Sequence, residues 1–373
     1  MESVTNIIAE NIKRRRKQLY LTQEELGAQL GYSVKTISKW ESGNGTPPTV
    51  ILPALALALK TDVGQLLTAE SKSHFYLGID GGGTKTEFAL ADNEGQIIRS
   101  LLLGTSNPSD IGIHATLEVL RAGISEICAH ISKKSVSLFA GLAGGSTDGV
   151  SEQIQQFLNS FGFAKVAHGS DAKSAVAAGL GKQDGVAVIM GTGSVAFAQH
   201  SGKQTRVGGY GYLLGDEGSG FSFGRDALLT ALQFEDGSGE ASAIVDLVKA
   251  HCQSQNVLEK LGSFYEGGKR IIADYARCVF EAYRMGDRIA ETIVNQNLKA
   301  VAKMVRGAAN RLPKNNIPVP VVLCGGLACA EGNVIIPILE RILSEDSKKY
   351  EISICRHSMI YGALTLAGMP EKK

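Results

Sequence analysis

Three glycine turns, each directly after an apolar segment, constrain the fold of this chain more than any other feature. The apolar segments are rich in β-branched residues and predict strands, and the turns follow at 81–83, 191–193 and 325–326. Glycine permits the positive φ angles of tight turns and lets another group approach the backbone closely. Predicted helices lie between the strands, and strands followed by alternating strands and helices occur twice. This order favours an α/β protein of two related lobes.

The first seventy residues differ from the rest of the chain. They predict short amphipathic helices joined by polar turns, whereas the glycine clusters begin only after His74. We therefore expect a domain boundary near Glu70–Ser73. The predicted domains are residues 1–70, a first lobe at 74–181 to which a C-terminal helix at 358–370 returns, and a second lobe at 182–357.

Composition excludes several classes of protein. With 44% hydrophobic residues and a net charge of +1 over 373 residues, the chain predicts neither disorder nor general attraction to nucleic acid. Its six cysteines form no C-x-x-C pair, which argues against a disulfide framework, a zinc site and an iron–sulfur cluster. The N-terminus lacks a signal-peptide core, and the longest apolar run, Val50–Leu59, contains Pro53 and is too short to span a bilayer. We therefore expect a soluble cytoplasmic protein with no membrane partner.

The first domain carries ordered helix start and stop signals. Thr22 is followed three residues later by Glu25, which predicts a capping box at the start of a second helix. Gly31 predicts the next turn, Ser33 the N-cap of a third helix, and Gly43 the end of that helix. The predicted core residues are Leu26, Leu30, Ile37 and Trp40.

These signals, with the segments L-T-Q-x-E-L and I-S-K-W-E-S-G, resemble the lambda-repressor and Cro class of helix-turn-helix domains. The resemblance implies that the third helix enters the major groove of DNA, and the basic run Lys13–Lys17 would add salt-dependent attraction to phosphates. Because one copy of such a domain binds weakly, a homodimer is implied. The alternative is a small helical bundle that binds a protein partner. The residues implied to contact DNA are Gln23, Ser33, Val34, Lys35 and Lys39.

The glycine turns are expected to bind a nucleotide. In L-G-I-D-G-G-G-T-K-T, Thr84 and Lys85 add hydroxyl and ammonium donors to the bare glycine backbone, and V-A-V-I-M-G-T-G-S repeats this with Thr192 and Ser194. The third turn leaves backbone against which an adenine ring could lie. Each turn alone is also compatible with a turn that has no ligand, but the combination is specific. The expected nucleotide-binding residues are Gly81, Gly82, Gly83, Thr84, Lys85, Gly191, Thr192, Gly193, Ser194, Gly325 and Gly326.

Over about residues 75–370 the chain resembles the actin-like ATPase and sugar-kinase superfamily, and within it the N-acetylglucosamine kinase branch that shares a family with the BadF, BadG, BcrA and BcrD ATPases. The resemblance rests on G-I-D-G-G-G-T-K-T, S-D-A at 170–172, G-T-G-S, and G-G-Y-G-Y-L-L-G-D-E-G-S-G at 208–220. It implies a two-lobed actin-like (ribonuclease H-like) ATPase fold. It also implies transfer of the ATP γ-phosphoryl group to a sugar hydroxyl.

The resemblance further implies roles for single residues. Asp171 would be the general base, Asp80 would hold Mg²⁺ through water, and Asn107, Gly209 and Asp216 would contact the sugar. The residues themselves leave other interpretations open, namely Asp171 as a helix N-cap, Asn107 as a turn residue and Asp216 as part of a solvated loop. Because Asp171 precedes an Ala-rich helix, we expect the helix dipole to lower its pKa.

Two positions depart from the vertebrate N-acetylglucosamine kinase pattern. Val195 replaces an asparagine that helps to hold the sugar, and Ser146 stands where an aspartate is usual. The identity of the sugar therefore stays open among N-acetylglucosamine, N-acetylmuramic acid, glucosamine and other hexose derivatives.

Missing cysteine motifs disfavour two neighbouring families. The ROK repressors and kinases carry a cysteine-rich zinc motif, and the dehydratase-activating ATPases of the BcrA type carry a cluster-binding cysteine; neither is present in this sequence. We therefore expect an ATP- and magnesium-dependent sugar kinase with an attached DNA-binding domain. The alternative is a transcriptional regulator that uses the kinase fold as a sugar or nucleotide sensor.

Overall fold

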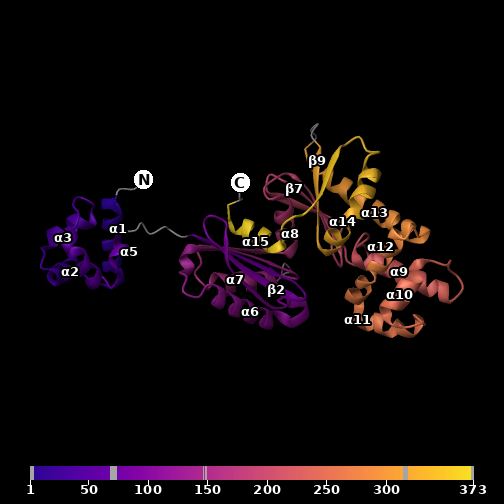
Figure 1. The fold of residues 1–373 in the computed structure, drawn as a ribbon, viewed down its shortest axis with the longest axis horizontal. Coiled ribbons are helices and arrows are strands. Elements are labelled where there is room, and N and C mark those ends of the chain that lie inside the picture. Colours follow the sequence, from indigo (N-terminus) through magenta and orange to yellow (C-terminus); the bar gives the residue numbers. More distant parts are fainter. Residues whose placement is uncertain (1–3, 68–73, 146, 148, 314–317, 371–373) are drawn as a thin grey trace. The chain divides into compact units, whose positions relative to one another are not determined.

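The computed structural model describes residues 4–67, 74–145, 147, 149–313 and 318–370. The chain divides into two compact units, Met1–Ser73 and His74–Lys373 (Figure 1). The expected boundary Glu70–Ser73 and the departure at Ser146 lie outside the described residues. Within the described part of the chain, every helix is too short or too polar to cross a membrane.

The described part of the first unit is helical. Its helices are α1 (Val4–Gln18), α2 (Gln23–Leu30), α3 (Val34–Glu41), the 3₁₀ turn Thr49–Ile51, α4 (Leu52–Ala58) and α5 (Val63–Leu67). The predicted capping box is confirmed: the Glu25 amide donates to the Thr22 hydroxyl at 3.1 Å, and the Thr22 amide donates to Glu25 Oε2 at 2.6 Å. Ser33 caps α3 as expected, because its hydroxyl accepts from the Thr36 amide at 3.2 Å.

The core of the first unit agrees with the expected one. Leu26, Ile37 and Trp40 are buried, and Leu30 packs against them from a partly buried position. Residues of α1, α4 and α5 complete this core, which the short α2–α3 pair could not form alone. The third helix has Ser42 at its C-cap, one residue before the expected Gly43, whose φ of 72° turns the chain away.

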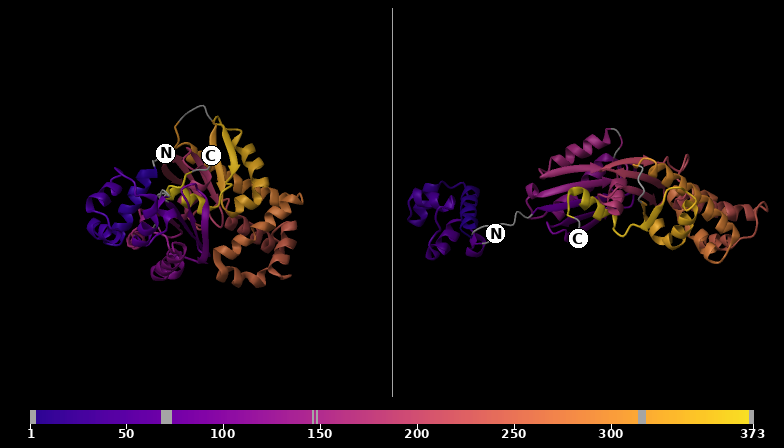
Figure 2. Two further views of the ribbon diagram at one scale, coloured as in Figure 1. Left: turned by 60° about the vertical axis from the view of Figure 1, so that its left-hand side comes forward. Right: turned by 90° about the horizontal axis from the view of Figure 1, so that it is seen from above.

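The second unit contains two five-stranded sheets with the same topology (Figures 1 and 2). In each sheet three consecutive strands pair antiparallel. A fourth strand pairs in parallel with the first of them, and a fifth pairs in parallel with the fourth. The first sheet has the order β3-β2-β1-β4-β5, with β1 (Phe75–Gly81), β2 (Lys85–Ala91), β3 (Ile97–Gly104), β4 (Val136–Leu142) and β5 (Lys165–Gly169). The second has the order β10-β9-β6-β7-β8, with β6 (Gly185–Met190), β7 (Ser194–His200), β8 (Lys203–Val207), β9 (Val319–Cys324) and β10 (Tyr350–Ile354).

Helices follow the third, fourth and fifth strands of each sheet in chain order. In the described residues they are α6 (Pro108–Ile127), α7 (Val150–Asn159), α8 (Asp171–Leu180), α9 (Gly220–Glu235), α10 (Ala243–Cys252), α11 (Leu261–Asp274), α12 (Ala276–Arg284), α13 (Arg288–Ala309), α14 (Gly326–Leu343) and α15 (Met359–Ala367), with 3₁₀ turns at Lys133–Ser135 and Leu258–Lys260. The segment from Arg270 to Asn310 is not one continuous helix. Gly286, with a φ of 80°, interrupts it, and Asp287 caps α13 by accepting from the Ile289 and Ala290 amides.

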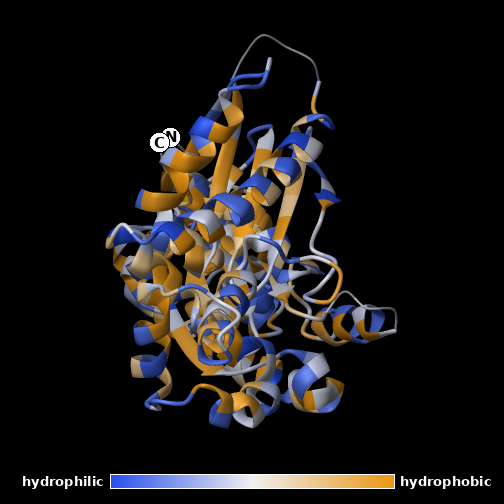
Figure 3. Cartoon of the chain, turned by 90° about the vertical axis from the view of Figure 1, so that its right-hand side faces the viewer, coloured by the Kyte–Doolittle hydropathy of each residue, from blue (hydrophilic) through white to orange (hydrophobic). Residues whose placement is uncertain are grey.

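Two helices connect the sheets. The C-terminal helix α15 packs on the first sheet, where Ile360, Ala363 and Leu364 share a core with Phe139. Helix α8 contributes Val176 to a cluster with strands of the second sheet. In Figure 3 the strands are coloured mainly as apolar and the helices alternate between apolar and polar residues, as expected for sheets covered by amphipathic helices.

Candidate active site

Two carboxylates meet at the end of the first sheet. Asp80 is the penultimate residue of β1 and is paired in parallel register with Gly141 of β4. The position that a Gly141 Cβ would take lies 3.5 Å from the Cα atom of Asp171, the first residue of α8. The same position lies 2.2 Å from the Ser174 hydroxyl, so only glycine lets α8 approach β4 this closely. Gly141 therefore brings Asp171 next to Asp80.

Burial and proximity change the protonation of both acids. Loss of solvation raises the pKa of Asp80 to about 7, with further contributions from the negative charges of Asp171 and Glu87. The pKa of Asp171 is also raised by loss of solvation, although the Ala172 amide donates to Asp171 Oδ1 at 2.9 Å and opposes this. The expected lowering of the Asp171 pKa is therefore wrong, because desolvation outweighs the helix terminus. The N-cap interpretation is wrong as well, since Ser170 occupies that position.

The first glycine turn is tightly packed against a neighbouring loop. A Cβ at Gly81 would lie 2.2 Å from the Ser106 hydroxyl and 2.5 Å from Leu142 Cδ2. The Gly82 amide donates to the Lys85 carbonyl at 2.9 Å, so it is used inside the hairpin. The expected ligands that remain exposed here are Gly83, Thr84 and Lys85.

The second glycine turn is joined to the start of α9. The Gly220 and Phe221 amides donate to the Gly191 and Thr192 carbonyls at 2.8 and 3.2 Å. Thr192 is exposed, whereas Ser194 is buried and its hydroxyl donates to the Glu217 carbonyl at 2.7 Å. Of the two expected hydroxyl ligands, the structure therefore presents only Thr192 at the surface.

Asp216 lies beside this second turn with a left-handed φ of 67° and is only 5% exposed. Its Oδ1 accepts from the Ser194 amide at 3.2 Å, and its Oδ2 accepts from Lys269 Nζ at 2.6 Å. Both carboxylate oxygens thus hold parts of the second lobe together. The solvated-loop interpretation of Asp216 is wrong, since its side chain is buried.

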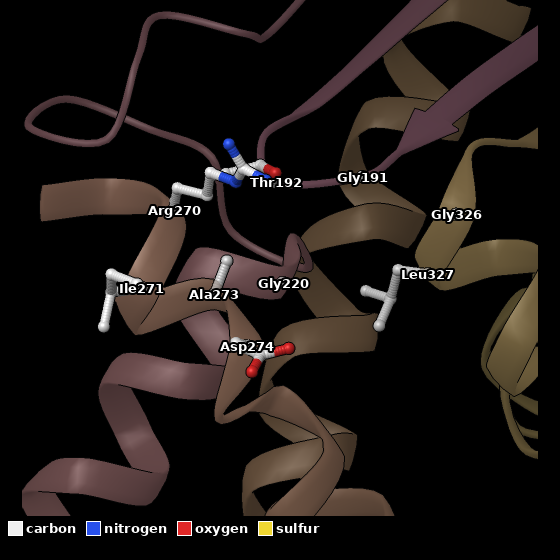
Figure 4. Close-up of a pocket in the computed structure, with 9 residues that line it drawn as sticks. All are labelled: Gly191, Thr192, Gly220, Arg270, Ile271, Ala273, Asp274, Gly326 and Leu327. Atoms are coloured by element: carbon white, nitrogen blue, oxygen red, sulfur yellow. The ribbon is translucent and has the colours of Figure 1, made fainter. Parts of the chain in front are cut away.

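A pocket of about 610 Å³ lies against the second turn (Figure 4). Helix α11 forms one side, and Leu327 at the start of α14 faces it across the opening. The lining residues are Gly191, Thr192, Gly220, Arg270, Ile271, Ala273, Asp274, Gly326 and Leu327. Gly326 leaves open space where a side chain would be. Gly325 has a φ of 97°, and a Cβ there would lie 2.6 Å from the Met190 carbonyl oxygen. The lining combines apolar side chains, the charged Arg270 and Asp274, and a polar glycine turn, and this combination suits a purine ring and phosphates.

The residues expected to contact sugar lie apart in the chain. Asn107 caps α6, with Oδ1 accepting from the Ser109 amide at 3.0 Å and Nδ2 donating to Asp110 Oδ2 at 2.7 Å. It lies next to the first turn, because a Cβ at Gly83 would be 3.2 Å from Asp110 Oδ2. Gly209 has a φ of 68°, and a Cβ there would lie 2.7 Å from Val195, the position of the departure noted above.

The acids at the end of the first sheet fit a hydrated divalent cation better than a direct metal ligand set. Among the described residues, no group of three or more His, Cys, Asp and Glu side chains could hold a metal ion. Asp80 nevertheless has the negative charges of Asp171 and Glu87 nearby, and their repulsion raises its pKa. A cation held through water would relieve that repulsion, as magnesium sites commonly do.

The exposed face of α3 in the first unit carries the expected DNA contacts. Val34, Lys35 and Lys39 are exposed there, and Ser33 is exposed at its N-cap. Gln23 is only partly exposed, and its Nε2 donates to Glu41 Oε2 at 2.7 Å.

The basic run of α1 differs from expectation at one residue. Arg16 is not exposed, since its side chain is 11% accessible and pairs with the buried Glu41. Its guanidinium also donates to the Leu21 carbonyl at 2.6 Å. Arg16 therefore fixes α1 to α3, and it is not a phosphate contact.

Sequence reasoning missed the contribution of α11 to the pocket. Four lining residues, Arg270, Ile271, Ala273 and Asp274, follow a break at Gly268, whose φ is 59°. The signal for this element is the sequence G-G-K-R at 267–270, a glycine pair inside a helical stretch followed by two cations. The long amphipathic pattern that continues beyond these residues hides the break.

Residues 77–367 match the model of the BadF/BadG/BcrA/BcrD ATPase family, and residues 12–66 match a helix-turn-helix model. The chain belongs to the BadF/BadG/BcrA/BcrD ATPase family. Among its relatives is an N-acetylmuramic acid/N-acetylglucosamine kinase of Clostridium acetobutylicum, 26% identical over 300 residues that cover 79% of this chain and 98% of the relative.

Solved structures confirm the two-lobed ATPase fold. A proposed N-acetylglucosamine kinase from Chromobacterium violaceum matches with a TM-score of 0.61 and 24% identity, covering 79% of this chain and 99% of that chain. A ROK family transcriptional regulator, described as a homolog of the E. coli MLC protein, matches with a TM-score of 0.54 and 12% identity and covers 98% of this chain and 96% of that chain. The expected actin-like fold with a preceding helical domain is therefore confirmed.

Proposed function

We propose that this protein is an ATP-dependent kinase that phosphorylates N-acetylglucosamine or a related amino sugar. The observation that carries the proposal is the pair of half-buried acids, Asp80 and Asp171, at the end of β1 and the start of α8. The pKa values of both acids are raised toward the neutral pH range. A carboxylate with such a raised pKa is a more effective base than a fully solvated carboxylate. The relative from Clostridium acetobutylicum, matched over 98% of its length, supports the choice of sugar class.

In this proposal Asp171 accepts the proton of the sugar hydroxyl as that oxygen attacks the γ-phosphorus of ATP. The bond from the γ-phosphorus to the bridging oxygen breaks, and ADP leaves with the electron pair. Thr192 and the exposed part of the first turn hold phosphate oxygens, while the pocket between α11 and α14 holds the adenosine. Asp80 would hold Mg²⁺ through water, and the bound ion would neutralise phosphate charge.

Asn107 and Gly209 stay proposed sugar contacts, one beside each glycine turn. Asp216 keeps one lone pair on each oxygen after its bonds to Ser194 and Lys269, so a sugar contact there would use the remaining acceptor capacity. Val195 fills the space beside Gly209 with an apolar side chain. We therefore include N-acetylmuramic acid and glucosamine among the candidate substrates.

The test is ADP release by the purified full chain with magnesium, ATP and a panel of amino sugars and hexoses. We expect sugar-dependent release that falls by about 10²- to 10⁴-fold in Asp171→Asn, because the general base is lost. Binding of ADP by the variant should stay unchanged. The matched control is Asp246→Asn, an exposed acid of α10, which should release ADP as the wild type does. Full turnover by Asp171→Asn would contradict the proposed base.

The exposed face of α3 favours a second function in DNA binding by a homodimer. The side chains of Lys35 and Lys39 are exposed on that face, where they could contact phosphates or base edges. For duplex DNA, each Lys→Ala change should reduce the slope of log affinity against log salt by about 0.9. Lys60→Ala, outside α3, is the control.

If saturating sugar or nucleotide also changes the affinity for DNA, the kinase fold acts as a sensor. Unchanged affinity would mean that DNA binding is not coupled to the kinase site.

A further inference from the structure

Lys269 lies against the second glycine turn, in a position that the proposed kinase mechanism does not yet use. Its Nζ atom is 2.6 Å from Asp216 Oδ2 and 2.9 Å from the position that a Cβ of Gly193 would take. A side chain larger than hydrogen at Gly193 would therefore displace the ammonium group. The second glycine turn and Lys269 are therefore in close contact.

The break in α11 is what places Lys269 there. Gly268 has a φ of 59° and a ψ of −155°, which only glycine adopts without strain, and it redirects the helix before Lys269. The next residue, Arg270, lines the pocket together with Thr192 (Figure 4). One short segment thus delivers a cation to the turn and another to the pocket.

The charge balance of the pocket leaves a need for such a cation. Its charged lining residues are Arg270 and Asp274. Asp274 is itself paired with His251 at 2.9 Å and with Arg277. A nucleotide that places its phosphates on the second turn brings several negative charges, and a cation beside that turn would add to the charge that Arg270 supplies.

The ion pair with Asp216 uses only part of the hydrogen-bonding capacity of Lys269. An ammonium group has three donors, and Asp216 accepts one of them. The lysine side chain is 31% exposed, whereas that of Asp216 is 5% exposed. The buried acid therefore holds one side of the ammonium group, while part of the lysine side chain stays accessible.

We propose that Lys269, held by Asp216, binds the phosphate chain of the nucleotide on the second glycine turn. This inference rests on the proposed nucleotide site and adds a residue from α11 to it. Asp216 acts here as a positioning residue. A purely structural role, in which Lys269 only neutralises the buried Asp216, is the alternative.

The test measures binding of MgADP and of adenosine to the full chain by calorimetry, without any sugar. For Lys269→Met we expect the Kd of MgADP to rise by about 10- to 100-fold, the loss typical of a charge-assisted hydrogen bond. The Kd of adenosine should change by less than about threefold, because adenosine has no phosphate. Lys269→Arg should retain most of the MgADP affinity, since it restores the cation.

Two further variants separate the alternatives. The double variant Asp216→Asn, Lys269→Met removes the unpaired buried acid, and we expect it to bind MgADP as weakly as Lys269→Met alone. Lys249→Met breaks a similar pair with Glu235 in the same lobe, at 3.4 Å, and should bind MgADP normally.

Three outcomes would overturn the inference. They are an equal loss for adenosine and MgADP, recovery of MgADP binding in the double variant, and wild-type affinity in Lys269→Met. The last would leave the kinase proposal intact. Failure of the wild-type protein to bind MgADP at all would instead overturn the nucleotide site and this inference together.

Discussion

The two sheets of the second unit share one topology and differ in chemistry at equivalent positions. Asp80 precedes the last ladder pair of the β1–β2 hairpin, and Ile189 precedes the last pair of the β6–β7 hairpin. Asp171 begins the helix that follows the fifth strand of the first sheet. Met359 begins the corresponding helix, which follows the fifth strand of the second sheet. Each acid of the first sheet thus has an apolar counterpart in the second.

The backbone at the two helix starts is nearly the same in both halves, whereas the first turn is one residue longer than the second. The amides of Gly82 and Gly191 both donate across their turns at 2.9 Å. Ser170 and Ser358 occupy the N-caps with φ and ψ of −68° and 155° and of −69° and 159°. The chemical difference is mainly in side chains: the first half supplies the acids, and the second supplies the proposed nucleotide pocket with Arg270 and the neighbouring Lys269.

The largest expected effect tests whether, of the equivalent residues Asp80 and Ile189, only the acid contributes to catalysis. Asp80→Asn should lower kcat for sugar phosphorylation by at least about 10²-fold, because it removes charge that positions the metal-bound phosphates. Ile189→Val, the counterpart change in the second sheet, should leave kcat within about twofold. Steady-state ADP release measures both. Equal losses in the two variants would show that the halves are not functionally different.

The second prediction concerns the place where the two equivalent helices cross. A Cβ at Gly362 of α15 would lie 1.9 Å from the backbone carbonyl of Ser174 on α8, so Gly362→Ala should lower the free energy of unfolding by about 3 kcal/mol. Ser174→Ala is the matched change on the other helix. Its buried hydroxyl has no hydrogen-bond partner among the described residues, so its loss should be neutral or stabilising by up to about 1 kcal/mol. Urea unfolding measures both, and a tolerated Gly362→Ala would refute this contact.

A third, smaller effect should distinguish the two glycine turns. Gly81→Ala would place a methyl group 2.2 Å from the Ser106 hydroxyl and should cost about 1–2 kcal/mol of unfolding free energy. Gly191→Ala meets no atom within 4 Å and should leave thermal stability nearly unchanged. Its methyl group would instead enter the nucleotide pocket and weaken MgADP binding. Equal destabilisation by the two variants would contradict the different packing of the turns.

The smallest expected effect is the part of the pH dependence of stability that Asp80 contributes. Asp80 has its pKa raised to about 7 in the folded protein, whereas an unfolded Asp titrates near about 3.9. Between these values the folded state binds more protons than the unfolded state. The free energy of unfolding of the ligand-free protein should therefore fall as pH rises through this window, by well under about 1.4 kcal/mol per pH unit.

Asp80→Asn removes this contribution, so its stability should depend less on pH over the same range. Ile189→Val should keep the wild-type slope, since it changes no titrating group. Urea unfolding of the three proteins across the window compares the slopes. If the wild type and Asp80→Asn have the same slope, the acid is not desolvated as the structure indicates.

The sequence by itself determined the local structure and the family of this protein. Strand and glycine-turn patterns predicted both hairpins, and Thr22, Glu25 and Ser33 predicted helix starts that the structure confirms. These features depend on residues close together in the chain, whose preferences act before any tertiary contact forms. The family followed from the order of such segments, which local patterns also preserve.

Only the tertiary structure decided how the side chains are used. The pKa of Asp171 is raised, Arg16 is committed to Glu41, and Asp216 is paired with Lys269 from a helix break more than fifty residues later. Burial and long-range pairing set each of these outcomes, and neither can be derived from neighbours in the chain. Local sequence patterns specify the local backbone conformation, whereas desolvation and charge pairing of side chains arise only when distant segments pack together.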